Sequence, residues 1–151
     1  MKYSVWTFFI FLILFGILNS CKKEKEDVNQ TVYLLTKQSW TLVSIRQNIN
    51  NSGWVDIYSG FSPCVKDNKF FFNTDYTYYW DEGFTKCSPT DPQTFSNGTW
   101  SLSSDGLKLF TKFGLTTTNV DITLLDNSNL VTMKNSISGL DTISIETKYI
   151  H

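Results

Sequence analysis

The residues that could carry out chemistry are few and scattered in this chain of 151 residues. Asp67, Asp81 and Glu82 are three carboxylates in one region, and paired carboxylates can act as general acid and base. We favour a structural interpretation, in which they accept hydrogen bonds in turns. The one histidine is His151, so no histidine cluster is present for a catalytic or zinc site. We therefore predict no catalytic residue, no metal site and no cofactor, and we expect a protein that is not an enzyme.

Cys21 follows a segment with the features of an export signal. Lys2 supplies a positive charge, and residues 5–18 form an apolar run that is shorter than the roughly 20 residues of a membrane-spanning helix. The four residues that end at Cys21, Leu-Asn-Ser-Cys, resemble the lipobox of bacterial lipoproteins, although Asn19 departs from the commonest residues. The resemblance implies cleavage before Cys21 and a diacylglycerol on its sulfur. We therefore expect a signal peptide at 1–20, rather than an uncleaved anchor helix.

The segment 21–30 is dominated by Lys, Glu and Asp, a composition typical of a solvated, flexible tether. It also resembles the charged signals that follow the lipidated cysteine in surface-exported lipoproteins of Bacteroidetes. We expect three parts: a signal peptide at 1–20, a lipidated cysteine with its tether at 21–30, and a folded domain at 31–151. The expected location is the cell envelope. There the lipid on Cys21 would anchor the protein in the outer membrane, facing the periplasm or the cell surface.

Cys64 and Cys87 remain as an even pair once Cys21 carries a lipid. In an oxidising compartment outside the cytoplasm, such a pair favours a disulfide. Two free buried thiols and a metal-binding pair are the alternatives, but structural zinc needs four ligands and no histidine is near. We expect the disulfide, which in the chain-entropy model would stabilise the fold by about 3 kcal/mol.

The composition excludes several classes of protein. Hydrophobic residues make up 41% of the chain and aromatic residues 16%, so the chain can bury enough apolar surface to fold. The 13 basic and 14 acidic residues leave a formal net charge of −1. A near-neutral chain lacks the basic field on which nucleic-acid binders depend. We therefore expect one globular domain and no nucleic-acid partner.

Short apolar or alternating segments follow one another from residue 39 onward, with Asn, Asp, Ser and Gly between them. The expected strands are residues 39–47, 69–73, 76–80, 98–102, 107–113, 119–125, 130–134 and 140–148. The one expected helix is 31–38, with Thr31 as its N-cap. Strands without helices between them favour an antiparallel meander that closes into a barrel, because closure removes exposed strand edges. We therefore predict an all-β fold, an eight-stranded antiparallel up-and-down barrel with a short N-terminal helix.

The order of these residues resembles a known family. Trp40 in the first strand, Cys64 and Cys87 around two aromatic strands, and a Gly-Thr-Trp motif that ends at Trp100 follow one another. In this order they look like the lipocalin-like domain of Bacteroidetes lipoproteins, over essentially all of residues 31–151. The resemblance implies a barrel of the lipocalin or calycin type, and most members of the family have no assigned function.

Aromatic residues are the candidates for a ligand site. Tyr76, Tyr78 and Trp80 share one face of their strand, which we expect to point inward because the opposite face carries Asp81. Trp100 is expected in the floor or wall, beside a glycine that allows close approach of the strand. We interpret each first as core, since such a barrel is just wide enough to be filled by side chains or to hold one small ligand. A ligand, if bound, should be amphipathic and lie near Tyr78, Trp80 and Trp100.

Alternation along the later strands predicts the rest of the interior. The residues expected to face inward are Leu107, Leu109, Phe113, Val120, Ile122, Leu124, Ile143 and Ile145.

Two functions from different classes remain open. In the first, a membrane-anchored, non-enzymatic envelope lipoprotein binds a small hydrophobic or amphipathic molecule in its barrel. In the second, the barrel is solid and the protein is a structural or interaction module that docks onto other envelope or surface proteins through its loops. A cavity on the order of several hundred Å³ would favour the first, and a packed interior the second.

Overall fold

The computed structural model describes residues 20–151, with side chains described from Val28 onward. Apart from Ser20, the expected signal peptide lies outside the described residues, and so does the side chain of Cys21. The signal peptide, the lipidation and the division into three parts therefore stay predictions. Within the described part of the chain, no helix combines the length and the apolar character needed to cross a membrane.

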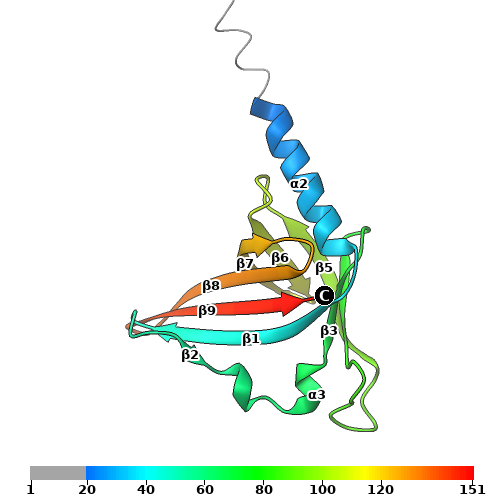
Figure 1. Cartoon of the computed structure of the whole chain (residues 1–151), viewed down its shortest axis with the longest axis vertical. Coiled ribbons are helices and arrows are strands. Elements are labelled where there is room, and N and C mark those ends of the chain that lie inside the picture. Colours follow the sequence, from blue (N-terminus) through cyan, green and yellow to red (C-terminus); the bar gives the residue numbers. More distant parts are fainter. Residues whose placement is uncertain (1–19) are drawn as a thin grey trace, which may run out of the picture.

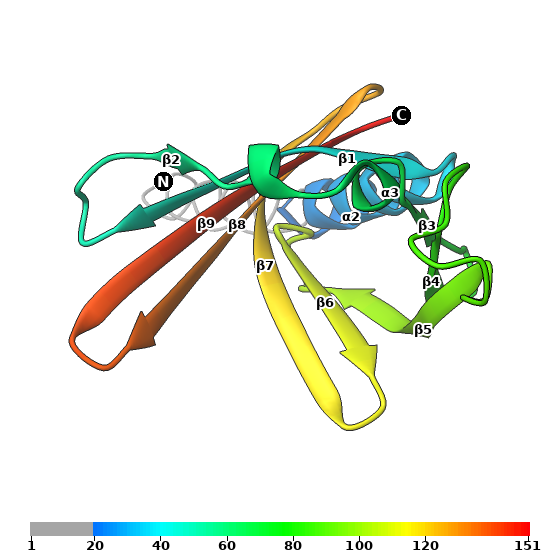
Figure 2. The same ribbon diagram turned by 90° about the horizontal axis from the view of Figure 1, so that it is seen from below.

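The domain is a closed antiparallel β-barrel (Figures 1 and 2). The barrel strands are β1 (Trp40–Ile49), β3 (Lys69–Phe72), β4 (Thr77–Asp81), β5 (Thr94–Leu102), β6 (Lys108–Phe113), β7 (Thr116–Leu125), β8 (Asn129–Ser138) and β9 (Asp141–Ile150). Each strand pairs with the next in this order, and the barrel closes where β1 pairs with β9. The eight-stranded up-and-down barrel predicted from the sequence is confirmed.

The connection between β1 and β3 contains three short elements. A two-residue strand, β2 (Val55–Asp56), pairs with Arg46 and Gln47 along the part of β1 that β3 leaves free. A 3-10 helix (Tyr58–Gly60) and the short helix α3 (Pro63–Lys66) follow. None of the three is predicted from the sequence, because each is too short to show a hydrophobic period.

Two strands exceed their predicted length by four residues or more. β5 begins at Thr94 instead of residue 98, and β8 continues to Ser138 instead of ending at residue 134. The added residues are mostly polar and include Asn and Ser, which have weak intrinsic preference for strands. Ladders with β4 and β9 hold these residues in extended conformation. Pairing therefore overrides local preference here.

The N-terminal helix α2 (Ser20–Thr36) is longer than the predicted helix at 31–38. It includes the segment 21–30, for which the sequence predicts a flexible tether. Lys and Glu have good helix propensity, so a segment rich in both can extend a helix whose last turns are held by packing. Figure 1 shows the helix meeting the barrel at its C-terminal end and standing away from it at its N-terminal end.

α2 closes one end of the barrel, which we call the floor. Leu35 is fully buried there, and the indole N–H of Trp40 donates a hydrogen bond to the Leu35 carbonyl at 2.9 Å. Gly106, in the β5–β6 turn, adopts a φ of 72° and lies so close to the helix that a Cβ would be 3.2 Å from Oγ1 of Thr31. The buried core cluster at this end is Leu35, Trp40, Phe72, Tyr78, Trp100, Leu109 and Leu130. We call the opposite end, where the β6–β7 and β8–β9 hairpins turn, the rim.

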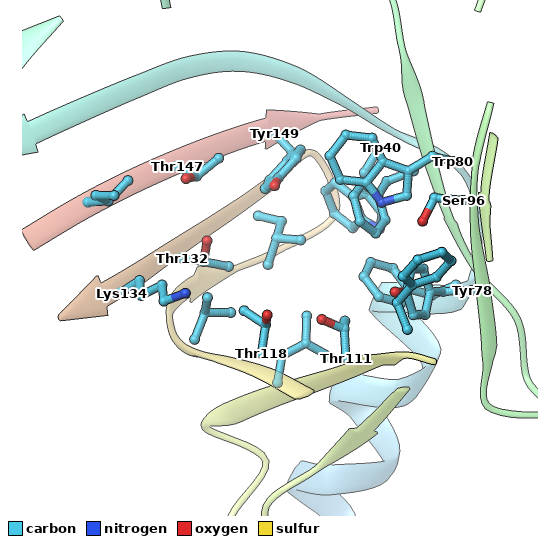
Figure 3. A pocket seen from close by; sticks show the side chains of 17 residues that line it. Trp40, Tyr78, Trp80, Ser96, Thr111, Thr118, Thr132, Lys134, Thr147 and Tyr149 are labelled. Carbon is cyan, nitrogen blue, oxygen red and sulfur yellow. The ribbon is translucent and has the colours of Figure 1, made fainter. Parts of the chain in front are cut away.

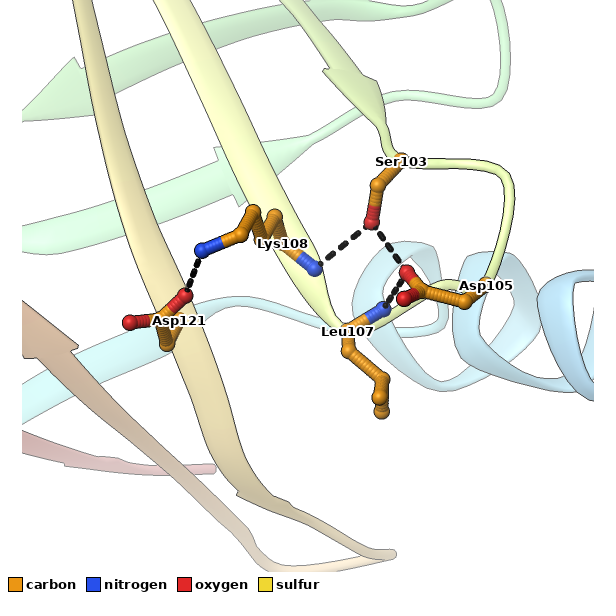
Figure 4. Close-up of polar contacts among 5 residues, drawn as sticks. All are labelled: Ser103, Asp105, Leu107, Lys108 and Asp121. Atoms are coloured by element: carbon orange, nitrogen blue, oxygen red, sulfur yellow. Dashed lines mark hydrogen bonds and ion pairs between the residues drawn. The ribbon is translucent and has the colours of Figure 1, made fainter.

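Polar contacts fix the β5–β6 turn at the floor (Figure 4). The carboxylate of Asp105 accepts hydrogen bonds from the hydroxyl of Ser103 and from the backbone N–H of Leu107. These two bonds, the Ser103 bond first, hold the pKa of Asp105 below its ordinary value. The N–H of Lys108 donates to the Ser103 hydroxyl, and the Lys108 ammonium pairs with Asp121 on β7. Lys108 therefore connects the turn to β6, on which it lies, and to β7, through Asp121.

The prediction of which residues face the interior is correct where the strands are regular. The residues that line the interior or pack against the core as predicted are Leu109, Phe113, Val120, Ile122 and Ile145. Ile143 is half-buried, nearer the rim. The prediction is wrong for Leu107, which is exposed because it lies in the turn before β6. It is also wrong for Leu124, because the β7–β8 register shifts between Ile122 and Leu124 and such a bulge turns the following residues to the other face.

Cys64 in α3 and Cys87 in the β4–β5 loop form a disulfide, as predicted. Their Cα atoms are 5.1 Å apart, and 23 positions separate them in the sequence. The bridge fastens the connection before β3 to the loop after β4. It therefore encloses the aromatic β3–β4 hairpin in one covalent loop.

Candidate ligand-binding cavity

The barrel contains a cavity of about 360 Å³ above the floor (Figure 3). All eight barrel strands contribute to its lining. The aromatic lining residues are Trp40, Phe70, Phe72, Tyr78, Trp80, Phe113 and Tyr149. The hydroxyl-bearing ones, other than tyrosine, are Ser96, Thr111, Thr118, Thr132 and Thr147. The cavity is therefore amphipathic, with an apolar bottom and a more polar wall.

The register of the β3–β4 hairpin builds the aromatic layer at the bottom of the cavity. Phe70 pairs with Trp80 and Phe72 with Tyr78, and residues that pair directly across two strands face the same side of the sheet. The ring centroid of Phe70 lies 4.2 Å from that of Trp80 and 5.8 Å from that of Tyr78. The rings thus form one packed apolar surface that faces the interior.

Gly98 lets β5 approach this layer. It pairs with Tyr78, and a Cβ at this position would lie 2.0 Å from the carbonyl oxygen of Lys112 and 2.9 Å from Cε1 of Tyr78. No side chain fits in this space. The predicted role of the glycine beside Trp100, close approach of the strand, is therefore confirmed.

Threonine hydroxyls line the wall in two cross-strand pairs. Thr111 on β6 pairs with Thr118 on β7, and Thr132 on β8 pairs with Thr147 on β9. Figure 3 shows these side chains around the cavity, toward the rim from the aromatic layer. A threonine presents a methyl group and a hydroxyl that both donates and accepts. The wall can therefore contact an apolar body and still satisfy polar groups.

Two tyrosine hydroxyls also belong to the lining. Burial raises the pKa of Tyr78 above its ordinary value, and a hydrogen bond with Ser96 acts in the opposite direction. Burial raises the pKa of Tyr149 from 10.0 to about 12. Both phenols therefore keep their protons at neutral pH, and a neutral phenol can donate a hydrogen bond to an acceptor in the cavity.

Lys134 is the charged residue among those that line the cavity. It lies on β8, paired with Ile145 of β9, and its side chain is exposed on the rim side. In Figure 3 the ammonium group points from β8 over the cavity. The ion pairs among the described side chains are Arg46–Glu146 and Lys108–Asp121, so Lys134 has no acidic partner there. The rim side of the cavity therefore carries an uncompensated positive charge.

Three of the four aromatic residues predicted for a ligand site face the interior. Tyr78 and Trp80 line the cavity. Trp100 lies beneath it in the core, 3% exposed, with its ring centroid 5.6 Å from that of Phe72. Its indole N–H donates to the carbonyl of Asn73 at 3.0 Å, so Trp100 forms part of the floor. A role for any of them in binding a ligand stays a prediction.

The prediction that Tyr76 faces the interior is wrong. Tyr76 is 50% exposed and adopts a φ of 65°, in the turn that precedes β4. Strand alternation does not apply to a turn residue, so its side chain does not follow Tyr78 and Trp80 into the barrel. Its ring instead lies beside Trp100, at a centroid distance of 5.0 Å.

The sequence analysis does not find Trp40, Tyr149 or Lys134 as lining residues. Alternation along β8 and β9 would have grouped Lys134 and Tyr149, since the inward faces are Leu130, Thr132 and Lys134 on one strand and Ile145, Thr147 and Tyr149 on the other. These faces mix apolar and polar residues, however. A mixed face does not stand out as an interior until a cavity is known.

The three carboxylates considered for catalysis stabilise loops near the disulfide. Asp67, Asp81 and Glu82 each accept a backbone hydrogen bond. The N–H of Thr85 donates to Asp67 at 2.8 Å. The N–H of Gly83 donates to Asp81 at 2.8 Å, and the N–H of Cys87 donates to Glu82 at 3.1 Å. The structural interpretation is therefore confirmed. In the described part of the chain, no three His, Cys, Asp or Glu side chains are grouped as they would be to hold a metal ion.

The fold and the cavity together define the class of protein, a closed eight-stranded up-and-down β-barrel with a covered floor and an internal cavity. No family model matches the chain, and no curated protein sequence matches it. Among solved structures, the chain is similar to bovine odorant binding protein in complex with a selenium-containing odorant. The identity is 11% and the TM-score 0.41, over 79% of this chain and 71% of that chain. The resemblance to the lipocalin-like domain of Bacteroidetes lipoproteins stays a prediction.

Proposed function

We propose that this protein is a non-enzymatic binding protein that holds a small amphipathic molecule inside its barrel. The observation that carries the proposal is the cavity of about 360 Å³, a volume within the range of small-molecule sites in proteins. The aromatic layer at the bottom offers a surface for a flat or aliphatic body. The threonine and tyrosine hydroxyls of the wall offer hydrogen bonds to polar groups of the same molecule.

An interaction module is the second candidate function. Large apolar side chains are exposed in four loops on the rim side, and they are Trp54, Phe84, Leu115 and Leu140. Contiguous exposed apolar patches mark interaction surfaces, and in this candidate function the four loops would supply the contact groups. The cavity favours the binding function, because a module that docks through its loops needs no interior space.

The first test uses the neutral fluorescent probe N-phenyl-1-naphthylamine, whose emission rises in an apolar site. The variant Thr147→Trp places a large side chain in the cavity wall. It should weaken binding by about tenfold or more, which corresponds to roughly 1.4 kcal/mol. The matched control is Thr99→Trp, the same substitution at an exposed position of β5 that does not line the cavity, and it should bind as the wild type does.

Two results would contradict the binding function. The first is that the probe shows no saturable binding to the folded wild-type protein. The second is that Thr147→Trp and Thr99→Trp bind the probe equally well. Near-UV circular dichroism of all three proteins shows whether a loss of binding comes from the filled cavity or from a loss of packing.

We also propose that the protein is an envelope lipoprotein, anchored in the outer membrane by a lipid on Cys21. The proposal is supported by the charged start, the apolar run and the lipobox-like residues before Cys21. In this arrangement α2 would separate the lipid from the barrel floor, and the rim would face away from the membrane.

The anchor proposal is tested by replacing Cys21 with Ala. The wild-type protein should sediment with the outer membrane, whereas Cys21→Ala should appear in the soluble fraction of the envelope. The purified variant should still bind N-phenyl-1-naphthylamine, because the barrel is unchanged. If Cys21→Ala stays with the membrane after washing without detergent, the lipid anchor is excluded.

A further inference from the structure

The barrel wall is incomplete between β7 and β8 on the rim side. From the floor toward the rim, the last residue pair between β7 and β8 is Asp121 with Met133. Beyond it, residues 116–120 and 134–138 have no partner across the two strands, although they remain paired with β6 and β9. Figure 2 shows the β6–β7 and β8–β9 hairpins diverging at this place. We call the unpaired stretch the β7–β8 seam.

The cavity extends to this seam. Thr118 and Val120 line it from the β7 side and Lys134 from the β8 side, and all three belong to the unpaired stretch. Thr132 lies directly below Lys134 on the same face of β8 and is buried. A molecule in the cavity would therefore have the aromatic layer at one end and, at the seam, an ammonium group with hydroxyls beside it.

The electrostatics of the seam favour a negative group. Two acidic residues on the adjoining strands already have basic partners among the described side chains. Asp121 on β7 pairs with Lys108, and Glu146 on β9 pairs with Arg46. No carboxylate lines the cavity, so none is available inside it for Lys134. A cation without a partner beside an apolar cavity attracts an anion, and charge-assisted hydrogen bonds are stronger than neutral ones.

We propose that the molecule held in the barrel is an anionic amphiphile whose carboxylate, sulfonate or phosphate head binds Lys134 at the β7–β8 seam. Its apolar body lies on the aromatic layer, and its head stays in contact with solvent through the seam. This inference rests on the proposed binding function and names the class of ligand for the same cavity.

The test compares two probes with the same phenylnaphthylamine body. One is neutral N-phenyl-1-naphthylamine, and the other is 8-anilino-1-naphthalenesulfonate, which adds a sulfonate. The wild-type protein should bind the sulfonate more tightly. In Lys134→Met the ratio of the two affinities, sulfonate over neutral, should fall by about tenfold, because one charge-assisted hydrogen bond is lost.

Three further variants sharpen the test. Lys134→Arg keeps the positive charge and should keep the wild-type preference, whereas Lys134→Glu should bind the sulfonate more weakly than Lys134→Met does. Lys112→Met removes a lysine from an exposed position of β6 outside the cavity lining and should leave the affinity ratio unchanged. Added salt should lower the affinity for the sulfonate more than the affinity for the neutral probe.

The outcomes separate this inference from the function on which it rests. If the neutral probe binds in the cavity and the affinity ratio is the same in wild type, Lys134→Met and Lys134→Glu, the anionic ligand is excluded and the binding function stands. If the ratio falls equally in Lys112→Met, the effect is one of net charge and the site at Lys134 is excluded. If neither probe binds the folded wild-type protein, the binding function itself fails.

Discussion

Gly98 shows how closely a single position can control this barrel. A Cβ there would lie 2.0 Å from the Lys112 carbonyl oxygen, which belongs to the backbone of the neighbouring strand and cannot move aside cheaply. We expect Gly98→Ala to lower the free energy of unfolding by about 1–3 kcal/mol, measured by urea denaturation. The matched control is Gly60→Ala, where a Cβ would meet no atom within 4 Å. Equal stability of the two variants would show that the close approach is not needed.

Tyr149 links stability to alkaline pH. Burial raises its pKa from 10.0 to about 12, so between these values the folded state keeps a proton that the unfolded state releases. Stability is therefore lost as the pH rises from 10 to 12, by roughly 2–3 kcal/mol for this group. We expect Tyr149→Phe to lose less stability than the wild type over this interval, measured as urea midpoints at each pH. Parallel curves for the two proteins would contradict the assignment to Tyr149.

Individual residues also show where prediction from the sequence stops. Alternation places Tyr78 and Trp80 correctly because both lie inside a regular strand. It fails for Tyr76, which lies in a turn with positive φ, and for Leu124, which follows a bulge. Turns and bulges depend on how the neighbouring strand pairs, and one chain segment read alone does not contain that information.

At the scale of elements, the disulfide fastens α3 to the β4–β5 loop around the aromatic hairpin. The chain-entropy model gives about 3 kcal/mol for a covalent loop of this size. We therefore expect the double variant Cys64→Ala/Cys87→Ala to lose about that much stability, measured by urea denaturation. Reduction of the wild-type protein should give the same urea midpoint as the double variant. A midpoint unchanged by reduction would show that packing alone holds the loop.

The sequence predicts the strands better than the short elements and the helix. Alternating and apolar segments mark all eight barrel strands, because each must present one face to the interior. β2 and α3 leave no such mark. The helix α2 begins at Ser20, far ahead of its predicted start, because charged residues that suggest a solvated tether also have good helix propensity. Composition alone does not separate these two outcomes.

At the scale of the whole molecule, the barrel could be predicted and the site only in part. Closure follows from the number of strands and the need to remove exposed edges. The cavity instead depends on how far opposite walls stand apart, which follows from the register of every strand pair together. Lys134 belongs to the site only through that spacing, because nothing in its own segment of the sequence indicates a position over a cavity.

The ladder that closes the barrel also has a consequence for how the chain folds. Five of the seven connections between successive barrel strands are short turns, but β1 and β9 bring together residues such as Arg46 and Glu146, which are 100 positions apart. Loop-closure entropy opposes so distant a contact until the hairpins between have formed. We therefore expect this ladder to form last during refolding. Until it does, β1 and β9 are open edges that can pair with another chain, so the yield of refolded protein should fall as the protein concentration rises.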